Sequence, residues 1–319
     1  MDILAVKRRL MMFLDNNEEL VKMYLDRFGV ELSMPNIKAI REMTAPDQEK
    51  AEPGEDPLYT IKVQCPVCKN RDIQAWELRS KSQVTVLDPF MMPIYSSAGD
   101  YRKVNYPHYA VTVCPKCYFA SPDKKDFNVW SRTRNEFQKS NMSPSIIVEL
   151  IHNMGVRQSL AEEFDTTANP LLKVRNYSGA INSYRLAIKR VETEITFGVN
   201  SATYKKANYW LKIALIQRLN NLNFDESLNL ARETLQTTYL KTDFPNAEHE
   251  YQGTYVLSAL ELYFKNNKLC REYQSSLDRI KSELNAVNSP NLNSCLKWIN
   301  KCKRLWDDRN REDLWDLPK

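Results

Sequence analysis

Two pairs of cysteines have the spacing needed to bind a metal ion. Cys65–Cys68 and Cys114–Cys117 are both Cys-Pro-x-Cys sequences, which place two thiols on one tight turn. The proline fixes φ, and the following amides point back at the sulfurs and stabilise their negative charge. Four thiolates form the closed tetrahedral set of a structural Zn²⁺ site with a net charge of −2. We expect one Zn²⁺ per chain, with Lys69, Arg71 and Lys116 offsetting that charge and the ligands being Cys65, Cys68, Cys114 and Cys117.

Other uses of these thiols stay open. A redox dithiol would not need a second matched pair, and no thioredoxin-like βαβ pattern surrounds either one. An iron–sulfur cluster and unbound thiols are further alternatives. His108 precedes Cys114 by six residues and could also ligate. We favour a loop histidine after Pro107, because four cysteines already complete the shell.

The remaining cysteines and the overall composition bear on compartment. The chain has seven cysteines, an odd number that suits a reducing compartment better than a disulfide framework. Cys295 and Cys302 lie seven residues apart on one helix face, and with Cys270 we expect them to be small buried hydrophobes. No run approaches the roughly 18 apolar residues of a membrane span, and the start lacks a convincing signal peptide. We therefore expect a cytoplasmic protein.

Short strands are expected to carry the cysteine pairs. Apolar residues alternate with polar ones over 59–63, 84–86 and 109–113, a period typical of half-buried strands. The first and last of these runs lead directly into a cysteine pair. The 45 residues between the pairs should form an inserted hairpin or loop. A β domain with so few apolar residues would gain stability from a metal.

Helical periodicity dominates from Ser143 onward. Ser143 is an N-cap followed by proline at the first helical position, and Asn169-Pro170 should end the first helical segment. Asn-rich links separate the segments that follow, which indicates antiparallel pairs. The predicted helices cover 172–195, 201–221, 223–241, 246–266, 268–286 and 291–307.

One helix carries the spacing of a tetratricopeptide repeat. Tyr177, Ala180, Tyr184 and Ala187 combine small residues that admit a neighbouring helix with aromatics that fill the groove beside them. Looser matches begin near Trp210 and Tyr255, with a period of about 45–50 rather than the standard value of about 34. We interpret the region as tetratricopeptide-like, with an ordinary helical bundle as the alternative.

The whole chain is predicted to be α+β and predominantly α. Only 7 glycines occur in 319 residues, against about 22 at average usage, which disfavours glycine-cradled nucleotide sites. We expect an N-terminal helical arm over 1–43, which serves packing or homodimerisation rather than targeting. A flexible acidic linker (44–57), a zinc-ribbon-like β domain (58–140) and a tetratricopeptide-like helical domain (141–319) should follow.

Residues 105–120 (NYPHYAVTVCPKCYFA) carry a family resemblance. They are similar to the signature of an uncharacterised bacterial family, domain of unknown function 2225, whose members pair an early Cys-Pro-x-Cys with such a stretch and continue into tetratricopeptide-like helices. The resemblance covers about residues 60–265. It departs at Tyr118-Phe119, where the family usually has Gly-Tyr, so the turn after the second pair should differ. The resemblance implies an architecture and a metal, not a reaction.

The leading functional hypothesis is a non-enzymatic intracellular scaffold. The sequence contains no P-loop, GxSxG, HExxH or GxGxxG motif, and its three histidines lie in different segments. The helical repeats would form a groove for a partner protein, with Tyr204, Lys205, Asn208 and Lys212 as a polar lining. A thiol redox or metal-dependent enzyme is a further alternative.

Nucleic-acid binding is the main rival hypothesis. Residues 59–140 hold 13 basic and 7 acidic residues. Arg132, Arg134 and Lys139 are interleaved with Trp130 and Phe137, which could stack on bases. Against it, residues 1–58 carry a net charge of −4, and the whole chain carries only +5. We therefore rank this function below protein binding.

Overall fold

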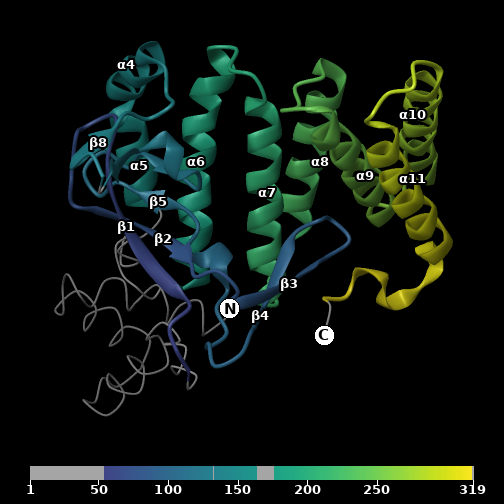
Figure 1. Ribbon diagram of the computed structural model, residues 1–319, viewed down its shortest axis with the longest axis horizontal. Coiled ribbons are helices and arrows are strands. Elements are labelled where there is room, and N and C mark those ends of the chain that lie inside the picture. Colours follow the sequence, from purple (N-terminus) through teal and green to yellow (C-terminus); the bar gives the residue numbers. More distant parts are fainter. Residues whose placement is uncertain (1–53, 132, 164–175, 318–319) are drawn as a thin grey trace, which may run out of the picture. The chain divides into compact units, whose positions relative to one another are not determined.

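The computed structural model describes residues 54–131, 133–163 and 176–317 (Figure 1). The predicted N-terminal arm, most of the acidic linker, Arg132 and the first residues of the predicted 172–195 helix lie outside the described residues. The described chain is α+β and predominantly α, as predicted. A β region over about residues 58–138 precedes a series of helices.

The main sheet has four antiparallel strands in the order β2-β1-β7-β8. Val63 of β1 pairs with Ile73 of β2 and Val129 of β7, and both Val63 and Ile73 are buried. Two smaller two-stranded sheets pair β3 with β4 and β5 with β6. The strand bounds are β1 Leu58–Gln64, β2 Ile73–Leu78, β3 Gln83–Leu87, β4 Pro93–Ser97, β5 Thr112–Val113, β6 Ala120–Ser121, β7 Asn128–Ser131 and β8 Glu136–Gln138.

Two of the predicted strands differ from their expected form. The 109–113 strand is reduced to Thr112–Val113, because Tyr106–His108 forms a 3₁₀ turn around Pro107. The carbonyl of Tyr106 accepts from the N–H groups of Tyr109 and Ala110, which a strand would use for pairing. The 84–86 strand exists within β3, but Val84 and Val86 are 54% and 46% exposed. The hairpin pairs with no third strand among the described residues, and Ile94 and the hairpin tip, not Val84 and Val86, pack against the helical core, so alternation alone does not bury these valines.

Helices follow the predicted order closely. Ser143 caps the first one, and its side chain accepts from the N–H of Ile146 (3.4 Å), with Pro144 at the first helical position. This segment divides at Asn153, earlier than predicted. The bounds are α4 Pro144–His152, α5 Met154–Glu163, α6 Tyr177–Thr196, α7 Ala202–Leu219, α8 Asp225–Lys241, α9 Ala247–Tyr263, α10 Asn267–Ala286 and α11 Leu292–Asp307.

Consecutive helices from α6 to α11 pack side by side, and α9 also packs against α11 (Figure 1). Asn246 and Asn266 from the Asn-rich links cap α9 and α10 with their side chains. The small residues of the repeat pattern lie at helix contacts, since Ala180 and Ala187 of α6 and Ala231 of α8 are each 1% exposed or less. Small residues there let the backbones of neighbouring helices approach closely.

The insert between the cysteine pairs contains the hairpin β3–β4, as predicted, and its tip is part of the helical core. Phe90, Met91 and Met92 are at most 8% exposed and belong to the same buried cluster as α7, α9 and α11. The ring of Phe90 stacks on Trp315 near the C-terminus at a centroid distance of 5.3 Å. The hairpin thus joins the β region to the helices. In the described residues, no helix is both long and apolar enough to cross a membrane.

Candidate metal centre

The two cysteine turns have the same backbone hydrogen bonds. In the first, the N–H of Lys69 donates to the carbonyl of Cys65 (3.1 Å), and the N–H of Cys65 donates to Asn70 (2.9 Å). In the second, the N–H of Tyr118 donates to the carbonyl of Cys114 (2.9 Å), and the N–H of Cys114 donates to the carbonyl of Phe119 (2.8 Å). Equivalent positions, four and five residues apart, are thus hydrogen-bonded in both turns, so the two turns match.

Each turn passes through one residue in the left-handed region. Lys69 has φ of 60° and Tyr118 has φ of 54°. This is the conformation that glycine adopts without steric cost, and a side chain makes it less favourable. Tyr118, which stands where the family usually has Gly, therefore adopts a backbone conformation that glycine favours. Tyr118 instead packs its ring against the core around α6.

The four cysteine sulfur atoms form one cluster. All four Sγ atoms lie within 4.8 Å of one another, with Cys65 and Cys117 3.5 Å apart and Cys68 and Cys114 3.4 Å apart. A Zn–S distance of about 2.3 Å in a tetrahedron implies sulfur–sulfur distances of about 3.8 Å. A disulfide needs about 2.05 Å. The arrangement therefore suits a metal ion and not a disulfide.

Contacts among the sulfurs move the pKa values of the cysteine thiols in opposite directions. Hydrogen bonds from Cys117 and Cys65 lower the pKa of Cys114 to about 2. Hydrogen bonding with Cys114 raises the pKa of Cys117 to about 12 and also raises the pKa of Cys65. One thiol therefore deprotonates readily, and the negative charge of its thiolate disfavours deprotonation of a second thiol. A divalent cation would remove this opposition, so the donor set fits one.

A cation that sequence reasoning missed lies beside the centre. Arg157 of α5 is 1% exposed, and its guanidinium donates to the carbonyls of Cys117 (3.2 Å), Leu150 (2.6 Å) and Asn153 (3.4 Å). Burial lowers the pKa of Arg157, while the neighbouring sulfurs raise it. Its positive charge therefore compensates the cysteines from the helical side. No local sequence pattern marks it.

The cations expected to face the sulfurs lie elsewhere. Lys69, Arg71 and Lys116 are exposed. The ammonium group of Lys69 donates to the carbonyl of Pro66 (2.7 Å), and the guanidinium of Arg71 lies over the ring of Phe137 (5.8 Å).

The other candidate ligands do not join the cluster. His108 is buried in the Tyr106–His108 turn and does not belong to the four-sulfur group. Cys270, Cys295 and Cys302 are at most 3% exposed and lie in the core of α9–α11, as predicted.

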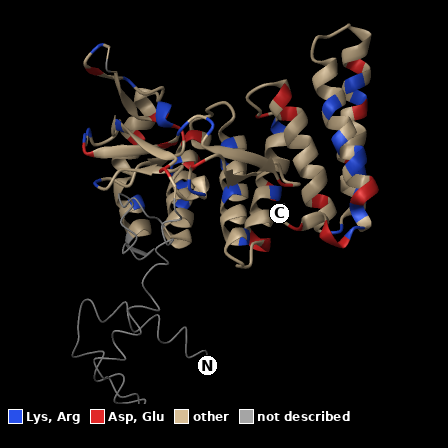
Figure 2. Ribbon diagram, turned by 60° about the horizontal axis from the view of Figure 1, so that its bottom comes forward, with Lys and Arg blue, Asp and Glu red and all other residues tan. Residues whose placement is uncertain are grey.

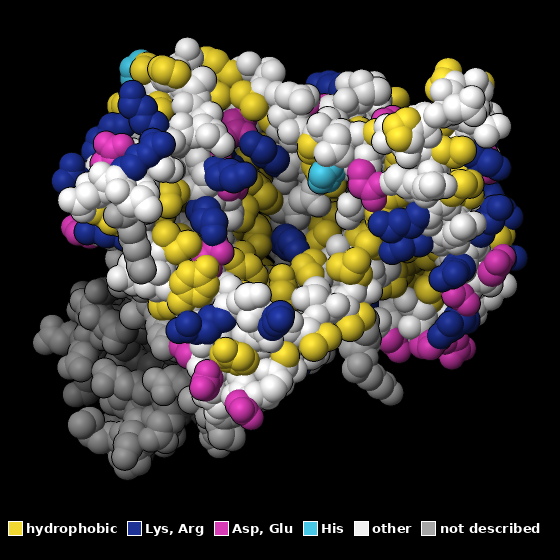
Figure 3. All heavy atoms as spheres, in the orientation of Figure 1, with side chains coloured by type: hydrophobic (Ala, Val, Ile, Leu, Met, Phe, Trp, Pro, Cys, Tyr) yellow, Lys and Arg dark blue, Asp and Glu magenta, His cyan; other side chains and the backbone are white. Residues whose placement is uncertain are grey.

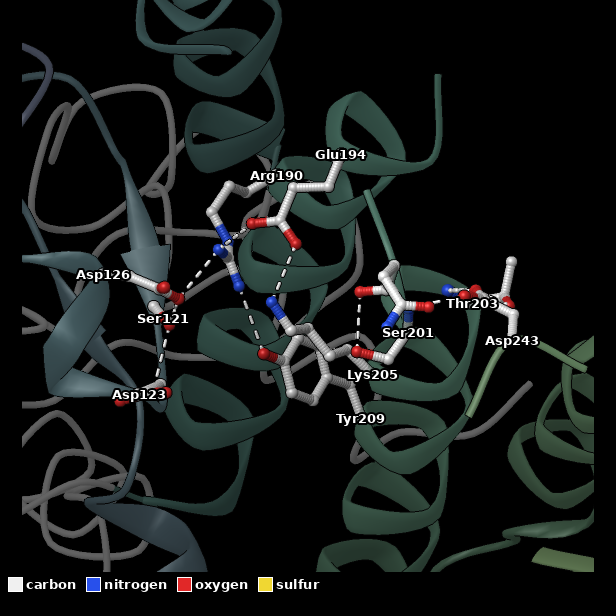
Figure 4. Close-up of polar contacts among 11 residues, drawn as sticks. Ser121, Asp123, Asp126, Arg190, Glu194, Ser201, Thr203, Lys205, Tyr209 and Asp243 are labelled. Carbon is white, nitrogen blue, oxygen red and sulfur yellow. Dashed lines mark hydrogen bonds and ion pairs between the residues drawn. The ribbon is translucent and has the colours of Figure 1, made fainter. Parts of the chain in front are cut away.

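A buried ion cluster connects the β region that carries the four cysteines to α6 and α7 (Figure 4). Arg190 of α6 is fully buried, forms ion pairs with Asp126 (2.8 Å) and Glu194, and donates to the hydroxyl of Tyr209 on α7 (3.2 Å). Lys205 of α7 pairs with Glu194 (3.1 Å). Two cations thus balance two carboxylates across three elements. Lys205, predicted to line a groove, is engaged in this cluster.

The remaining predicted groove residues lie along one stripe of α7, spaced four residues apart. Tyr204 contacts the rings of Phe244 (5.5 Å) and His249 (5.5 Å) at the start of α9. Asn208 and Lys212 are partly buried. Figure 3 shows that this face of the molecule is hollowed, with hydrophobic side chains at the floor and mainly Lys and Arg around them.

The fold and the site define a class: a β region with a four-cysteine cluster that is compatible with a metal, joined to antiparallel helices. The model of the family described as an uncharacterized protein conserved in bacteria (DUF2225) matches residues 58–309, and the chain belongs to that family. An uncharacterized protein of Borreliella burgdorferi (strain ATCC 35210 / DSM 4680 / CIP 102532 / B31) is 24% identical over 241 residues, which cover 71% of this chain and 85% of the relative. No solved structure matches the chain.

Proposed function

We propose that the protein is a non-enzymatic intracellular scaffold. One structural Zn²⁺ ion holds the β region through Cys65, Cys68, Cys114 and Cys117, and the hollowed face of α7, α9 and α11 binds a segment of a partner protein. The observation that supports this proposal is the hollowed face shown in Figure 3. Helical arrays of this kind use such faces to bind extended or helical peptides.

The choice of zinc rests on the donors. Four closely spaced thiolates leave no open coordination position, which is the arrangement of a structural rather than a catalytic zinc ion. Three of the four cysteines are completely buried, and Asn70 donates to Cys114 (4.0 Å), while Arg157 binds the adjacent backbone. These surroundings orient the ligands and supply positive charge.

Site-specific crosslinking in cells tests the scaffold. A photoreactive residue is placed at Asn208, on the stripe of α7 that also carries Tyr204 and Lys212. In a matched variant it is placed at the exposed Ser282 of α10. We expect the same protein to be crosslinked repeatedly from position 208 and not from position 282. Equal crosslinking from both positions, or none from position 208, would contradict the proposal.

A second candidate function, nucleic-acid binding by the β region, is favoured by one observation. Trp130 of β7 and Phe137 of β8 form an edge-to-face pair (5.0 Å), with Lys62 6.0 Å from the centre of the Trp130 ring and Arg71 near Phe137. Cations beside aromatic rings are typical of surfaces that bind single strands. Salt-sensitive binding of an oligonucleotide that is lost in Trp130→Ala would support this function. No binding at low salt would remove it.

A further inference from the structure

We propose that an aromatic notch at the ends of α7 and α9 binds a tryptophan-bearing segment of a partner protein, and that the chain's own C-terminal strap fills this notch when the partner is absent. The notch is formed by Phe90 at the hairpin tip, Arg218 and Tyr263, and the strap is residues 308–317. This inference deepens the scaffold proposal and rests on it. The contacts of the strap show which chemistry the notch accepts.

The strap leaves α11 and runs back toward the β3–β4 hairpin (Figure 1). It contains two 3₁₀ turns, Asp308–Asn310 and Glu312–Trp315. The ring of Trp315 stacks on Phe90 (5.3 Å between centroids) and meets the ring of Tyr263 edge to face (5.4 Å). Offset stacking and edge-to-face contact are the two arrangements that aromatic pairs prefer. The notch therefore holds an indole ring from two directions.

Arg218 binds the strap through its main chain. The guanidinium donates to the carbonyl of Trp315 and also to Asp88 at the hairpin tip (3.1 Å). Any peptide offers a main-chain carbonyl, whereas the stacking contact needs an aromatic ring. The notch therefore selects a segment by its tryptophan. Tryptophan is also one of the residues that most often dominate the binding energy of protein interfaces.

The notch has contacts of its own that do not involve the strap. Phe90 belongs to the helical core, and its ring meets Tyr263 edge to face (5.8 Å). The hydroxyl of Tyr263 donates to Asp225 at the start of α8 (2.6 Å). We expect these contacts to keep the notch formed when the strap leaves. A preformed site binds with a smaller loss of conformational entropy.

Few polar contacts hold the strap in place. Figure 2 shows charges of both signs on the strap, and they pair with one another, since Arg311 pairs with Asp308 (3.5 Å) and Asp313 (2.8 Å). Within the described parts of the chain, the hydrogen bond from Arg218 is the only one that joins the strap to an element other than α11. Such a segment can open locally at a lower free energy than that of global unfolding.

The space below the strap also favours its replacement. A pocket of about 670 Å³ lies between the strap, the hairpin tip and α11, with Leu314 and Leu317 of the strap opposite Met91 and Tyr255. Both leucines are only partly buried. Trp315 thus makes the close contacts of the strap, and the apolar side chains beside it have room to differ. A partner segment with a tryptophan and neighbouring apolar residues would fit the same space.

Fluorescence anisotropy tests the inference with a labelled peptide of residues 309–317 (RNREDLWDL) and the full chain. The strap of the wild-type chain competes with this probe, so Trp315→Ala should bind it at least about tenfold more tightly than the wild type does. Phe197→Ala, which removes a 45% exposed ring outside the notch, should bind it as the wild type does. No binding by Trp315→Ala, or equal affinities of Trp315→Ala and the wild type, would overturn the proposal.

Two altered probes test which chemistry the notch reads. Alanine in place of the tryptophan should weaken binding to Trp315→Ala at least about tenfold. A probe that keeps the tryptophan and the two leucines, with serine at every other position, should bind within about fivefold of the original, because exposed charges contribute little. Loss of binding with the serine probe would mean that the notch accepts only the strap, and would refute a partner of this chemistry.

Two further measurements use the wild-type chain and so do not depend on the folding of a variant. A probe with a benzophenone side chain in place of its tryptophan should crosslink to the hairpin tip or to the end of α9, and crosslinks confined to other segments would overturn the proposal. Sedimentation velocity tests whether copies exchange their straps. We expect no dimer that depends on the strap. A concentration-dependent dimer that Trp315→Ala removes would make a second copy the occupant and refute a different partner.

Failure here is separable from failure of the scaffold. Persistent crosslinks from Asn208 together with no probe binding would leave the scaffold in place and refute only the notch. Probe binding at the notch without crosslinks from Asn208 would refute the hollow as the contact surface and leave the notch as a peptide site.

Discussion

The buried ion cluster around Arg190 gives the sharpest prediction about stability. Arg190→Met keeps an apolar stem of similar length over Phe119, whose ring centre lies 5.9 Å from the native guanidinium. It removes the ion pairs with Asp126 and Glu194 and the hydrogen bond to Tyr209. The variant therefore tests the charge of Arg190 more than its packing.

The magnitude depends on which carboxylate loses its partner. Glu194 keeps its ion pair with Lys205 (3.1 Å), whereas Asp126, 7% exposed, keeps among the described residues only the side-chain hydrogen bond from Ser121 (2.6 Å). Removing one partner of a buried pair costs about 3–5 kcal/mol, because a buried charge remains uncompensated. We expect a loss of that size in the free energy of unfolding. Adding Asp126→Asn should recover about 1–2 kcal/mol, since a neutral amide needs no cation.

Urea unfolding of the metal-loaded full chain, followed by circular dichroism, measures both effects as a double-mutant cycle. Lys189→Met is the control, because Lys189 pairs with Glu192 (3.0 Å) at the surface of the same helix. Its loss should cost less than about 1 kcal/mol. A cost below about 1 kcal/mol for Arg190→Met, or strict additivity with Asp126→Asn, would refute the reasoning.

Three other predictions concern the metal, the helix packing and a buried acid. Elemental analysis should find about one zinc per chain, and Cys114→Ser should lose it together with thermal stability; iron, or metal-free thiols that oxidise readily, would favour redox chemistry instead. Gly253→Ala should lower the free energy of unfolding by about 1 kcal/mol, because the new Cβ would lie 2.5 Å from the ring of Phe244. Overpacking costs about 1–3 kcal/mol, which outweighs a helix-propensity gain of about 1 kcal/mol. A higher midpoint of thermal unfolding for this variant would show that the ring moves aside freely. Burial raises the pKa of Asp88 from 3.8 to about 6 despite Arg218. The folded state therefore binds this proton more tightly than the unfolded chain, and stability should fall by up to about 3 kcal/mol as pH rises from about 4 to 6. That decline should be missing from the urea-unfolding profile of Asp88→Asn, and an unchanged profile would contradict this assignment.

The parts of the site that the sequence predicts are local. A Cys-Pro-x-Cys turn is specified within four residues, and two such turns need only be brought together. The helices were predicted for the same reason, since periodicity and the Ser143 cap act over a few residues. The strand over 109–113 was overestimated, because Pro107 and the turn that follows it use backbone groups which a strand would need.

The parts that the sequence does not predict depend on distant contacts. Arg157 compensates the cysteines across 40 residues of chain through the Cys117 carbonyl, and nothing near position 157 indicates a metal. The tip of the β3–β4 hairpin is a short apolar run, Phe90–Met92, which local rules cannot assign to a partner. Only the fold shows that its partner is the helical core.

Three connections make the four-cysteine cluster and the helices structurally interdependent. Arg157 links the Cys117 turn to α4 through the Leu150 carbonyl. Arg190 ties Asp126, a few residues after the second turn, to α6 and α7. The hairpin that leaves the β region between the two turns contributes Phe90 to the helical core. All three of these contacts depend on the positions of the cysteine turns. A loss of metal should therefore loosen α6 and α7 as well as the β region, and the hollow beside α7 should change with it.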